Sequence, residues 1–267
     1  NDDGFYYDLM GGTTYVLRMS QRALFASDDT FSIQAFETAV NDECANRAAI
    51  SIAQGSPTNV PLDFRAGTES VNGPCETDSN QQLDLWYEFT MPIDGNVRIT
   101  GIPSTIYRTI YDACGGSELV CGNDDGFFYD LTSGTTYVLR MSQRALFANP
   151  NDFNIEPFAT ATNDECADRT LIAVGTSTTT NVPVDFRAGT ESVNGPCETA
   201  SNIQQDLWYE FTMPVNGNIR ITNIPSTIYR TLYDACGGTE LLCGNDDGYF
   251  YNLTSGTSYV LRMSQWE

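Results

Sequence analysis

The sequence contains neither lysine nor histidine, so its 13 basic residues are all arginines. The absence of histidine excludes a Ser-His-Asp triad, a Cys-His dyad and a histidine zinc site. The absence of lysine excludes Schiff-base chemistry, a Walker phosphate loop and a lysine–asparagine isopeptide bond. Composition therefore disfavours most enzyme classes, and we expect the protein not to be an enzyme.

Positive charge is also scarce, because 35 acidic residues against 13 basic ones give a formal net charge of −22. A surface this acidic repels phosphate backbones, so we expect no nucleic-acid partner. No apolar run reaches the roughly 18 residues that a transmembrane helix needs, so we expect no membrane span. No signal peptide is visible and the first residue is Asn1. We interpret the chain as a processed product or a segment of a longer one.

The eight cysteines contain no Cys-x-x-Cys pair, which argues against a metal cluster. An even number of cysteines in an acidic, lysine-free chain favours disulfide bonds formed in an oxidising compartment, and reduced buried thiols are the alternative. We therefore expect an extracellular or cell-surface location. The cysteines are Cys44, Cys75, Cys114, Cys121, Cys166, Cys197, Cys236 and Cys243.

An internal repeat determines the predicted organisation of the chain. Residues 1–5 recur almost unchanged at 123–127 and at 245–249, and both offsets are 122 residues. The same offset relates the first four cysteines to the last four without a gap. A period of this length is too long for a solenoid repeat and matches a whole domain. The chain is therefore a tandem array of similar domains.

Ala- and Thr-rich segments before Asn41 and Asn163 resemble linkers and set the domain boundaries. On this basis residues 1–40 are the C-terminal part of one repeat, 41–162 are a complete repeat, and 163–267 are the next repeat without its last strand or strands. Residues 1–23 restate 245–267. We therefore expect a segment of a longer continuous chain. The alternative is a strand-donating subunit, in which residues 24–40 complete the gap after 267 on a neighbour.

The hydrophobic pattern of one repeat predicts strands and no amphipathic helix. Residues 83–91 alternate between apolar and mostly polar side chains, with Leu85 expected to face the core and Trp86 the opposite side. Arg140 is likewise expected to face away from the core and to pair with Glu88. About seven to nine short strands in each repeat favour an antiparallel, jelly-roll-like β-sandwich. Further strands are predicted at 48–53, 59–64, 97–99, 106–111, 127–131, 135–141 and 153–158.

Four cysteines in each repeat allow three disulfide pairings. Cys114 and Cys121 bracket two adjacent glycines, the residues that a tight turn requires. We therefore predict a bond between Cys114 and Cys121 across a hairpin, which leaves Cys44 to pair with Cys75.

Acidic clusters in each repeat supply the hard oxygen ligands that Ca²⁺ takes. Their spacing does not match an EF-hand loop. Because Asn, Asp and Gly also favour turns, turn formation alone is the alternative to a bound calcium. The candidate ligands are Asn41, Asp42, Glu43, Asp112, Asp124, Asp125, Asn163, Asp164, Glu165, Asp246 and Asp247.

Trp86 and Trp208 are candidates for an aromatic platform that binds a sugar or another protein, because they lie on the strand face opposite the core positions. The alternative is packing beneath a loop or against a neighbouring domain. Paired carboxylates hydrolyse glycosides in some enzymes, but nothing here orders two of them in a recognisable frame.

Five motifs occur in order along one repeat: Asn-Asp-Glu-Cys at 41–44, Asp-Leu-Trp-Tyr-Glu-Phe-Thr-Met-Pro at 84–92, Ile-Tyr-Asp-Ala-Cys-Gly-Gly at 110–116, Leu-Val-Cys-Gly-Asn-Asp-Asp at 119–125 and Leu-Thr-Ser-Gly-Thr-Thr-Tyr-Val-Leu-Arg at 131–140. Together they resemble the bacterial pre-peptidase C-terminal domain, in the cysteine-containing form found as tandem repeats in large secreted and surface proteins of Bacteroidetes-type bacteria. The resemblance implies a jelly-roll-like β-sandwich, secretion and a non-catalytic role beside proteases or in adhesins. It also implies calcium near the N-terminal acidic segment, as in collagen-binding relatives.

These observations lead to one functional hypothesis and one alternative. The first is a non-catalytic structural or adhesive repeat of a long extracellular fibre, stalk or surface adhesin, whose partners are other copies or repeats of itself. The alternative is an accessory module of a secreted hydrolase that binds a collagen-like protein or a polysaccharide.

Overall fold

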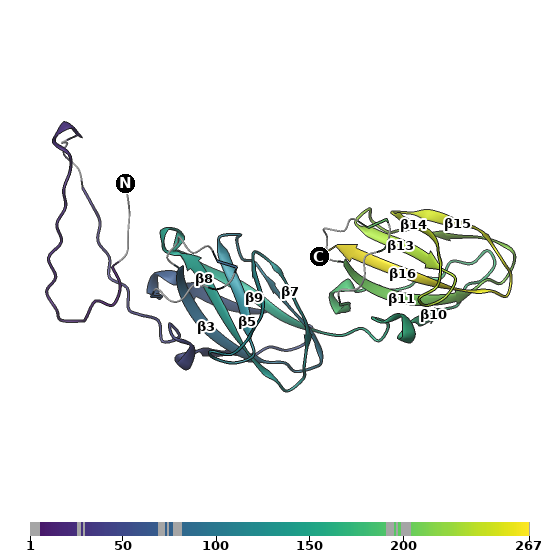
Figure 1. Cartoon of the computed structure of the whole chain (residues 1–267), viewed down its shortest axis with the longest axis horizontal. Coiled ribbons are helices and arrows are strands. Elements are labelled where there is room, and N and C mark those ends of the chain that lie inside the picture. The colour runs from purple at the N-terminus through teal and green to yellow at the C-terminus, as the bar shows by residue number, and fades with distance from the viewer. Residues whose placement is uncertain are drawn as a thin grey trace.

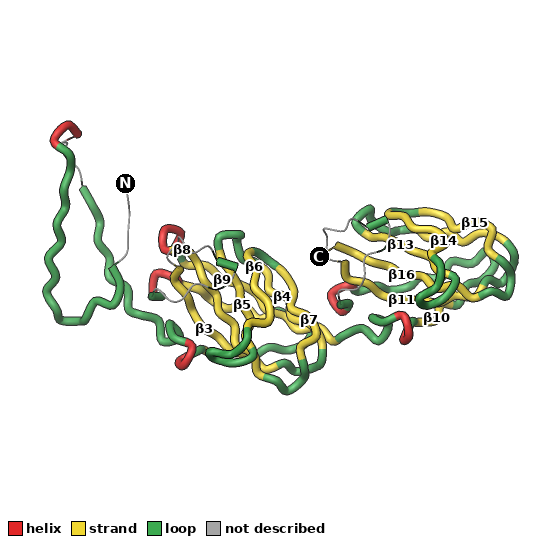
Figure 2. Tube along the Cα trace, in the orientation of Figure 1, coloured by secondary structure: helices red, strands yellow, loops and turns green. Residues whose placement is uncertain are grey.

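The computed structural model describes residues 6–25, 28, 30–68, 73, 75–76, 82–190, 195, 197–198 and 204–266. Figure 1 shows an extended N-terminal segment followed by two β-sandwich units placed end to end. Figure 2 shows that strands and loops make up almost all of this structure. In the described ranges, helical geometry is confined to short 3-10 turns. None of these turns has the length and hydropathy of a transmembrane helix.

The N-terminal segment, residues 6–40, runs as an extended chain whose described residues form no strand. Many of its apolar side chains face solvent; Val16 is 94% and Ile33 81% exposed. Its end lies on the first sandwich unit, where the Ala39 amide donates to the Ala66 carbonyl at 2.8 Å. The segment is thus attached to the unit that follows it.

The first unit contains two sheets, with strand orders β1-β3-β8-β5-β6 and β2-β9-β4-β7. The strands are β1 (Ala48–Ile50), β2 (Thr58–Asp63), β3 (Gln82–Thr90), β4 (Gly95–Thr100), β5 (Ile106–Tyr111), β6 (Glu118–Asn123), β7 (Gly126–Leu131), β8 (Thr136–Arg144) and β9 (Pro150–Ala159). β9 lies between β2 and β4 and pairs antiparallel with both. This strand therefore holds the second sheet together.

The core of the first unit lies between the two sheets. Leu85 and Phe89 of β3 contribute from one sheet, and Phe153 and Ile155 of β9 contribute from the other. Phe153 and Ile155 are completely buried. Alternation along both strands places these side chains on the inner faces, as the sequence predicted for β3.

The second unit repeats the first sheet but only part of the second. β10 (Thr170–Ile172), β11 (Gln204–Thr212), β16 (Ser258–Trp266), β13 (Ile228–Tyr233) and β14 (Glu240–Asn245) form a five-stranded sheet in that order. Within the described residues, the facing sheet contains only β12 (Gly217–Ile221) and β15 (Gly248–Leu253). Residues 180–185, which correspond to β2, form no strand. The core of this unit is correspondingly less complete.

The predicted fold class, tandem all-β sandwiches, is confirmed, but three details differ. β1 pairs with β3 in parallel, so the sheet is mixed rather than purely antiparallel. Strand β6 was not predicted, because its glycine and asparagine obscure the alternation. Glu88 does not pair with Arg140; it accepts a hydrogen bond from Arg47 at 2.7 Å, because the residue opposite Arg140 on β3 is Trp86.

Candidate functional site

A buried arginine lies on the outer face of the five-stranded sheet in the first unit. Arg140 of β8 is only 1% exposed although it points away from the core. Its Nε donates to Asp84 Oδ2 at 2.5 Å and its Nη1 donates to Glu76 Oε1 at 2.9 Å. Ser142 donates to the same Glu76 oxygen, and the Gly73 amide donates to Glu76 Oε2 at 2.7 Å. The network fixes the described part of the segment before β3 to the sheet.

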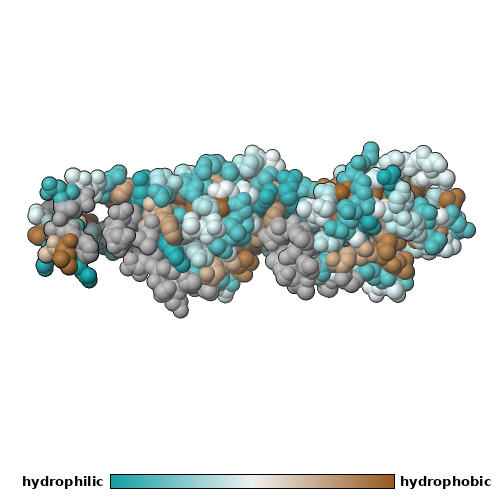
Figure 3. Space-filling model, turned by 90° about the horizontal axis from the view of Figure 1, so that it is seen from above, coloured by the Kyte–Doolittle hydropathy of each residue, from teal (hydrophilic) through white to brown (hydrophobic). Residues whose placement is uncertain are grey.

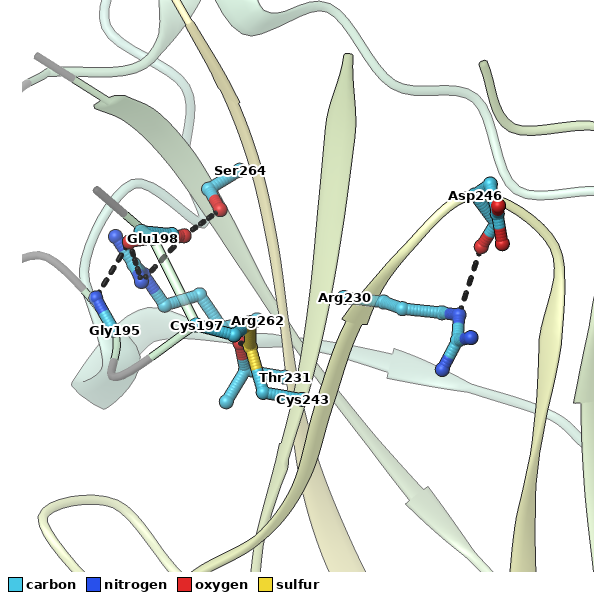
Figure 4. The surroundings of a disulfide bond; sticks show 9 residues. All are labelled: Gly195, Cys197, Glu198, Arg230, Thr231, Cys243, Asp246, Arg262 and Ser264. Carbon is cyan, nitrogen blue, oxygen red and sulfur yellow. Dashed lines mark hydrogen bonds and ion pairs between the residues drawn. A yellow bond between two sulfur atoms is a disulfide. The ribbon is translucent and has the colours of Figure 1, made fainter. Parts of the chain in front are cut away.

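The second unit contains the same network, and Figure 4 shows its contacts around Glu198 beside the Cys197–Cys243 disulfide. Arg262 donates to Asp206 and to both oxygens of Glu198. Ser264 and the Gly195 amide complete the bonds to Glu198. Repetition of every partner at the same offset indicates a structural requirement of the repeat.

The charges around these arginines compensate for their burial. Burial alone lowers the pKa of Arg140, but the carboxylates of Asp84 and Glu76 outweigh it and hold the pKa above its usual value. The guanidinium group also lies 5.8 Å from the ring centroid of Trp86. A buried charge of this kind stabilises the fold only while its partners remain, because the desolvation cost is large.

The predicted disulfide pairing is wrong, although all eight cysteines are bonded. Cys44 pairs with Cys114, and Cys75 pairs with Cys121. The register explains the difference: Cys121 of β6 lies opposite Thr109, whereas Cys114 lies in the loop between β5 and β6. The two cysteines therefore do not face each other across the hairpin. The second unit has the corresponding pairs Cys166–Cys236 and Cys197–Cys243.

The acidic candidates at the start of each unit take part in loop and turn bonding. Asp42 accepts hydrogen bonds from the amide and the hydroxyl of Thr68 at 2.5 and 2.6 Å. Asp164 makes the corresponding bonds to Thr190. The side-chain amide of Asn41 donates to the Trp86 carbonyl at 3.1 Å. The remaining members of this set are Asn163, which bonds to the Trp208 carbonyl, and the exposed Glu43 and Glu165.

The other acidic candidates lie at the loops around β6 and β14. Asp112 accepts from the Ser117 amide at 2.7 Å, and Asp125 accepts from the Ile102 amide at 3.0 Å. Asp124 has a φ of 79°, a left-handed conformation that Asp tolerates in turns. In the second unit, Asp246 has the left-handed conformation of Asp124, and Asp247 accepts the hydrogen bond that corresponds to that of Asp125. No group of three or more potential metal ligands occurs among the described residues.

Turn chemistry accounts for these contacts, and calcium binding remains a prediction with a simple test. Melting should be followed by circular dichroism with calcium and with a chelator of divalent cations. A bound structural ion raises the midpoint in the presence of calcium, because a ligand that binds only the folded state stabilises it. Equal midpoints in both solutions would contradict the calcium hypothesis. Magnesium at the same ionic strength controls for screening of the negative charge.

Trp86 and Trp208 are half-buried beside the arginine networks. The ring of Trp86 lies 5.7 Å from that of Tyr111, tilted by 35°. Trp208 and Tyr233 repeat this contact at 5.7 Å and 36°. Each tryptophan thus packs between an arginine and a tyrosine, and a role in ligand binding remains a prediction.

The junction between the two units is a site that the sequence did not predict. Asn96 of β4 is completely buried. Its side-chain nitrogen donates to the carbonyls of Arg187 and Gly189 in the second unit at 3.2 and 2.9 Å, and its oxygen accepts from the Asp130 amide at 3.4 Å. In the sequence, an asparagine after a glycine indicates a turn, so no pattern predicted that Asn96 would bond to the next unit.

Further contacts surround Asn96. Arg187 lies over the ring of Phe158 at 4.7 Å, and Gln205 donates to the Tyr129 hydroxyl at 2.8 Å. The Ala161 amide in the linker donates to the carbonyl of Ala188 at 2.8 Å. Buried hydrogen bonds, a cation–π contact and a bonded linker together restrict the orientation of one unit relative to the next.

Two of these contacts recur where the N-terminal segment joins the first unit. The guanidinium group of Arg65 lies 4.8 Å from the ring centroid of Phe36, which corresponds to the contact of Arg187 with Phe158. The bond from Ala39 to Ala66 corresponds to the bond from Ala161 to Ala188. The sequence that precedes each unit therefore lies on that unit in the same way at both junctions.

A cavity of about 530 Å³ lies beside this junction. Its lining combines Phe127 and Arg98 of the first unit with Asp185, Gln205 and Gln265 of the second. An aromatic ring next to hydrogen-bonding side chains is a common lining for small polar ligands. The guanidinium of Arg98 lies 5.4 Å from the ring centroid of Phe127.

Comparison with known proteins gives one family match. A model of a T9SS-associated family, described as galactose binding domain-like, matches residues 1–33, 40–155 and 162–267. No curated protein matches the chain.

Matches to solved structures are remote. The CUB1-EGF-CUB2 domains of rat MASP-1 are 9% identical, with a TM-score of 0.23, covering 81% of this chain and 99% of that one. An uncharacterized protein from Burkholderia cenocepacia is 10% identical, with a TM-score of 0.23 and 78% coverage of both chains. A calcium binding mutant of Bacteroides uniformis beta-glucuronidase 2 is 10% identical, with a TM-score of 0.20, covering 69% of this chain and 21% of that one.

Proposed function

Because the chain belongs to the T9SS-associated, galactose binding domain-like family, we propose that it is a non-catalytic structural and adhesive repeat of a long extracellular bacterial fibre, stalk or surface adhesin. T9SS is a secretion system of Bacteroidetes, which supports an extracellular location. Two disulfides in each unit suit the same location, since such bonds persist outside the reducing cytoplasm. The finer resemblance to pre-peptidase C-terminal repeats is part of this proposal.

The junction at Asn96 is the observation that carries the proposal. A flexible string of domains needs no buried hydrogen bonds between neighbours, whereas a stiff stalk does. Here a fully buried side chain bonds to two backbone carbonyls of the next unit, so rotation of the joint breaks both bonds. Repetition of such joints gives a rod that holds adhesive surfaces at a distance from the cell and multiplies weak contacts into avidity.

Substitution of Asn96 by alanine tests this role. We expect Asn96→Ala to remove both bonds to the second unit and to leave the Arg187 and Gly189 carbonyls without this donor, a loss of about 1–3 kcal/mol at the joint. Small-angle X-ray scattering of the monomeric chain should then show a wider range of overall dimensions than in the wild type. Proteolysis in the linker at residues 160–162 should also become faster.

Asn218→Ala is the matched control, because Asn218 occupies the corresponding position in β12 but is exposed. It should leave the scattering profile of the monomer unchanged. If Asn96→Ala scatters like both the wild type and the control, the joint is not held by this residue and the stiff-stalk proposal loses its main support.

The cavity beside the junction favours one alternative, a polysaccharide-binding accessory module. Arginine, acid and amide side chains next to an aromatic ring can recognise sugar hydroxyl groups. Galactose and galactose-containing polysaccharides should be titrated against the wild type and against Gln205→Ala by calorimetry. Saturable binding that the variant loses would favour this alternative, and absence of heat with all of these sugars would contradict it.

A further inference from the structure

Tension along the chain enters and leaves the first unit at opposite ends. Figures 1 and 3 view the molecule from perpendicular directions, and in both the N-terminal segment, the first unit and the second unit follow one another along one axis. The entering segment is bonded through Ala39 to Ala66. The chain leaves the unit after Ala159, where β9 ends. Any pull between the two neighbours of the first unit therefore passes through it.

Strand β9 lies along the direction of this pull. Its first residue, Pro150, pairs with Asp63 at the end of β2, and the 3-10 turn that ends at Ala66 follows directly. Its last residue, Ala159, pairs with Gly95 and leads into the linker. Because β9 pairs antiparallel with β2 on one side and β4 on the other, a pull on the linker loads both ladders in shear. The unit therefore resists extension through many hydrogen bonds that are loaded together.

A disulfide gives the tension a short covalent path once these hydrogen bonds have yielded. Cys44 lies near the start of the unit, in the 3-10 turn η2 (Cys44–Asn46) that precedes β1. It is bonded to Cys114, in the loop between β5 and β6, at a sequence separation of 70. Force that reaches Cys44 therefore passes directly to Cys114. Residues 45–113, which include β1 to β5, lie on a closed loop outside the load path.

The second disulfide, Cys75–Cys121, lies off this path. Cys75 belongs to the closed loop, and Cys121 follows Cys114 on the loaded chain. A route through Cys75 contains more chain than the route through Cys44 and Cys114, so it stays slack while the first bond is intact. Without the first bond, the second would take the load, and the bypass would then span a separation of only 46.

We propose that Cys44–Cys114 is the force-bearing bond of the first unit, so that under tension only the chain from Cys114 onwards extends. The bond withholds a separation of 70 residues from extension, which is roughly 230–250 Å of extended chain. Cys166–Cys236 spans the same separation in the second unit, so this function belongs to the repeat. The tension itself rests on the proposed role in a stalk, whereas the covalent path does not.

Single-molecule extension of the full 267-residue chain, held at its two ends, tests this path. The force is raised until the units yield, and a dithiol reductant, which is itself oxidised to a disulfide, is then added at constant force. Cleavage of Cys44–Cys114 should transfer the load to Cys75–Cys121 and lengthen the chain by 24 residues, the difference between the separations of 70 and 46. Cleavage of the second bond should then release the other 46.

These two steps correspond to about 80 and about 160 Å of extended chain. If Cys75–Cys121 is cleaved first, no step should occur until a single step of about 240 Å follows. Both units should give the same steps, because their disulfides have equal separations. Steps that match bonds between Cys44 and Cys75 and between Cys114 and Cys121 would overturn the proposal.

Two matched variants separate the bonds, with the unchanged second unit as an internal reference. Cys75→Ser with Cys121→Ser should leave the length gained on yielding unchanged, because this bond carries no load. Cys44→Ser with Cys114→Ser should increase that length by 24 residues. The opposite pattern would overturn the proposal, and the reduction of the wild type does not depend on the folding of either variant. A flexible joint at Asn96 would remove the stalk but leave these steps unchanged, so the two proposals fail separately.

Discussion

Replacement of Arg140 by methionine should lower the free energy of unfolding of the first unit by about 3–5 kcal/mol at neutral pH, because it leaves two buried carboxylates without their cation. Urea unfolding under non-reducing conditions measures this loss. Arg262→Met should produce a loss of similar size in the second unit, where the same partners surround the arginine. Each substitution should leave the other unit's transition in place.

The pH dependence distinguishes an uncompensated charge from a simple loss of packing. Without Arg140, burial raises the pKa of Asp84, so the folded state binds a proton more tightly than the unfolded state does. Stability of the variant then falls as pH rises from the usual pKa of an aspartate towards the raised pKa of the folded state, and the deficit relative to the wild type should shrink below about pH 4. Adding Asp84→Asn and Glu76→Gln should recover part of the loss at neutral pH. A deficit independent of pH would contradict this explanation.

Arg65→Met is the control for this series. Arg65 pairs with Asp63, but the two side chains are 28% and 42% exposed, so water already screens their charges. The same change of arginine to methionine should therefore have a much smaller effect on unfolding at this surface position. A loss as large as that of Arg140→Met would show that burial is not the cause.

Removal of the Cys44–Cys114 disulfide should destabilise the first unit by about 4 kcal/mol in the chain-entropy model, since the bond joins residues 70 apart. The variant is Cys44→Ser with Cys114→Ser, and thermal melting measures its effect. Removal of Cys75–Cys121, which joins residues 46 apart, should cost nearly as much because the dependence on loop length is logarithmic. Reduction of both bonds should unfold the unit at moderate temperature.

Peptide mapping without reduction checks the pairing independently of stability. The structure predicts linked peptides that join Cys44 to Cys114 and Cys75 to Cys121. A peptide that joins Cys114 to Cys121 would contradict it. Mixed variants, such as Cys44→Ser with Cys75→Ser, break both bonds and should be less stable than either matched pair.

Periodicity predicted the sandwich well because alternation reports directly on burial between two sheets. Leu85 and Phe89 face the core as their spacing requires. The same reasoning failed on the outer face, where Asp84 and Arg140 are as buried as the core. Glu76 and Gly73, which lie against Arg140, are far from it in the sequence, and no local pattern indicates such long-range contacts.

The disulfides and the joint show the same limit. Adjacent glycines suggested a hairpin bond at Cys114, but the pairing depends on the register of β5 and β6 and on where the start of the unit lies. Asn96 has no distinctive sequence context, and only the position of the next unit gives it a role. The repeat itself was the strongest signal, because it identified the units before any contact was known.

Residual dipolar couplings of the isotopically labelled monomer test the central claim, a fixed joint between the two units, most directly. If the contacts around Asn96 hold the units in one orientation, a single alignment tensor fits the couplings of both units in the arrangement of Figure 1. Two tensors of clearly different magnitude would mean that the units reorient independently, and would contradict the account of this chain as part of a stiff stalk.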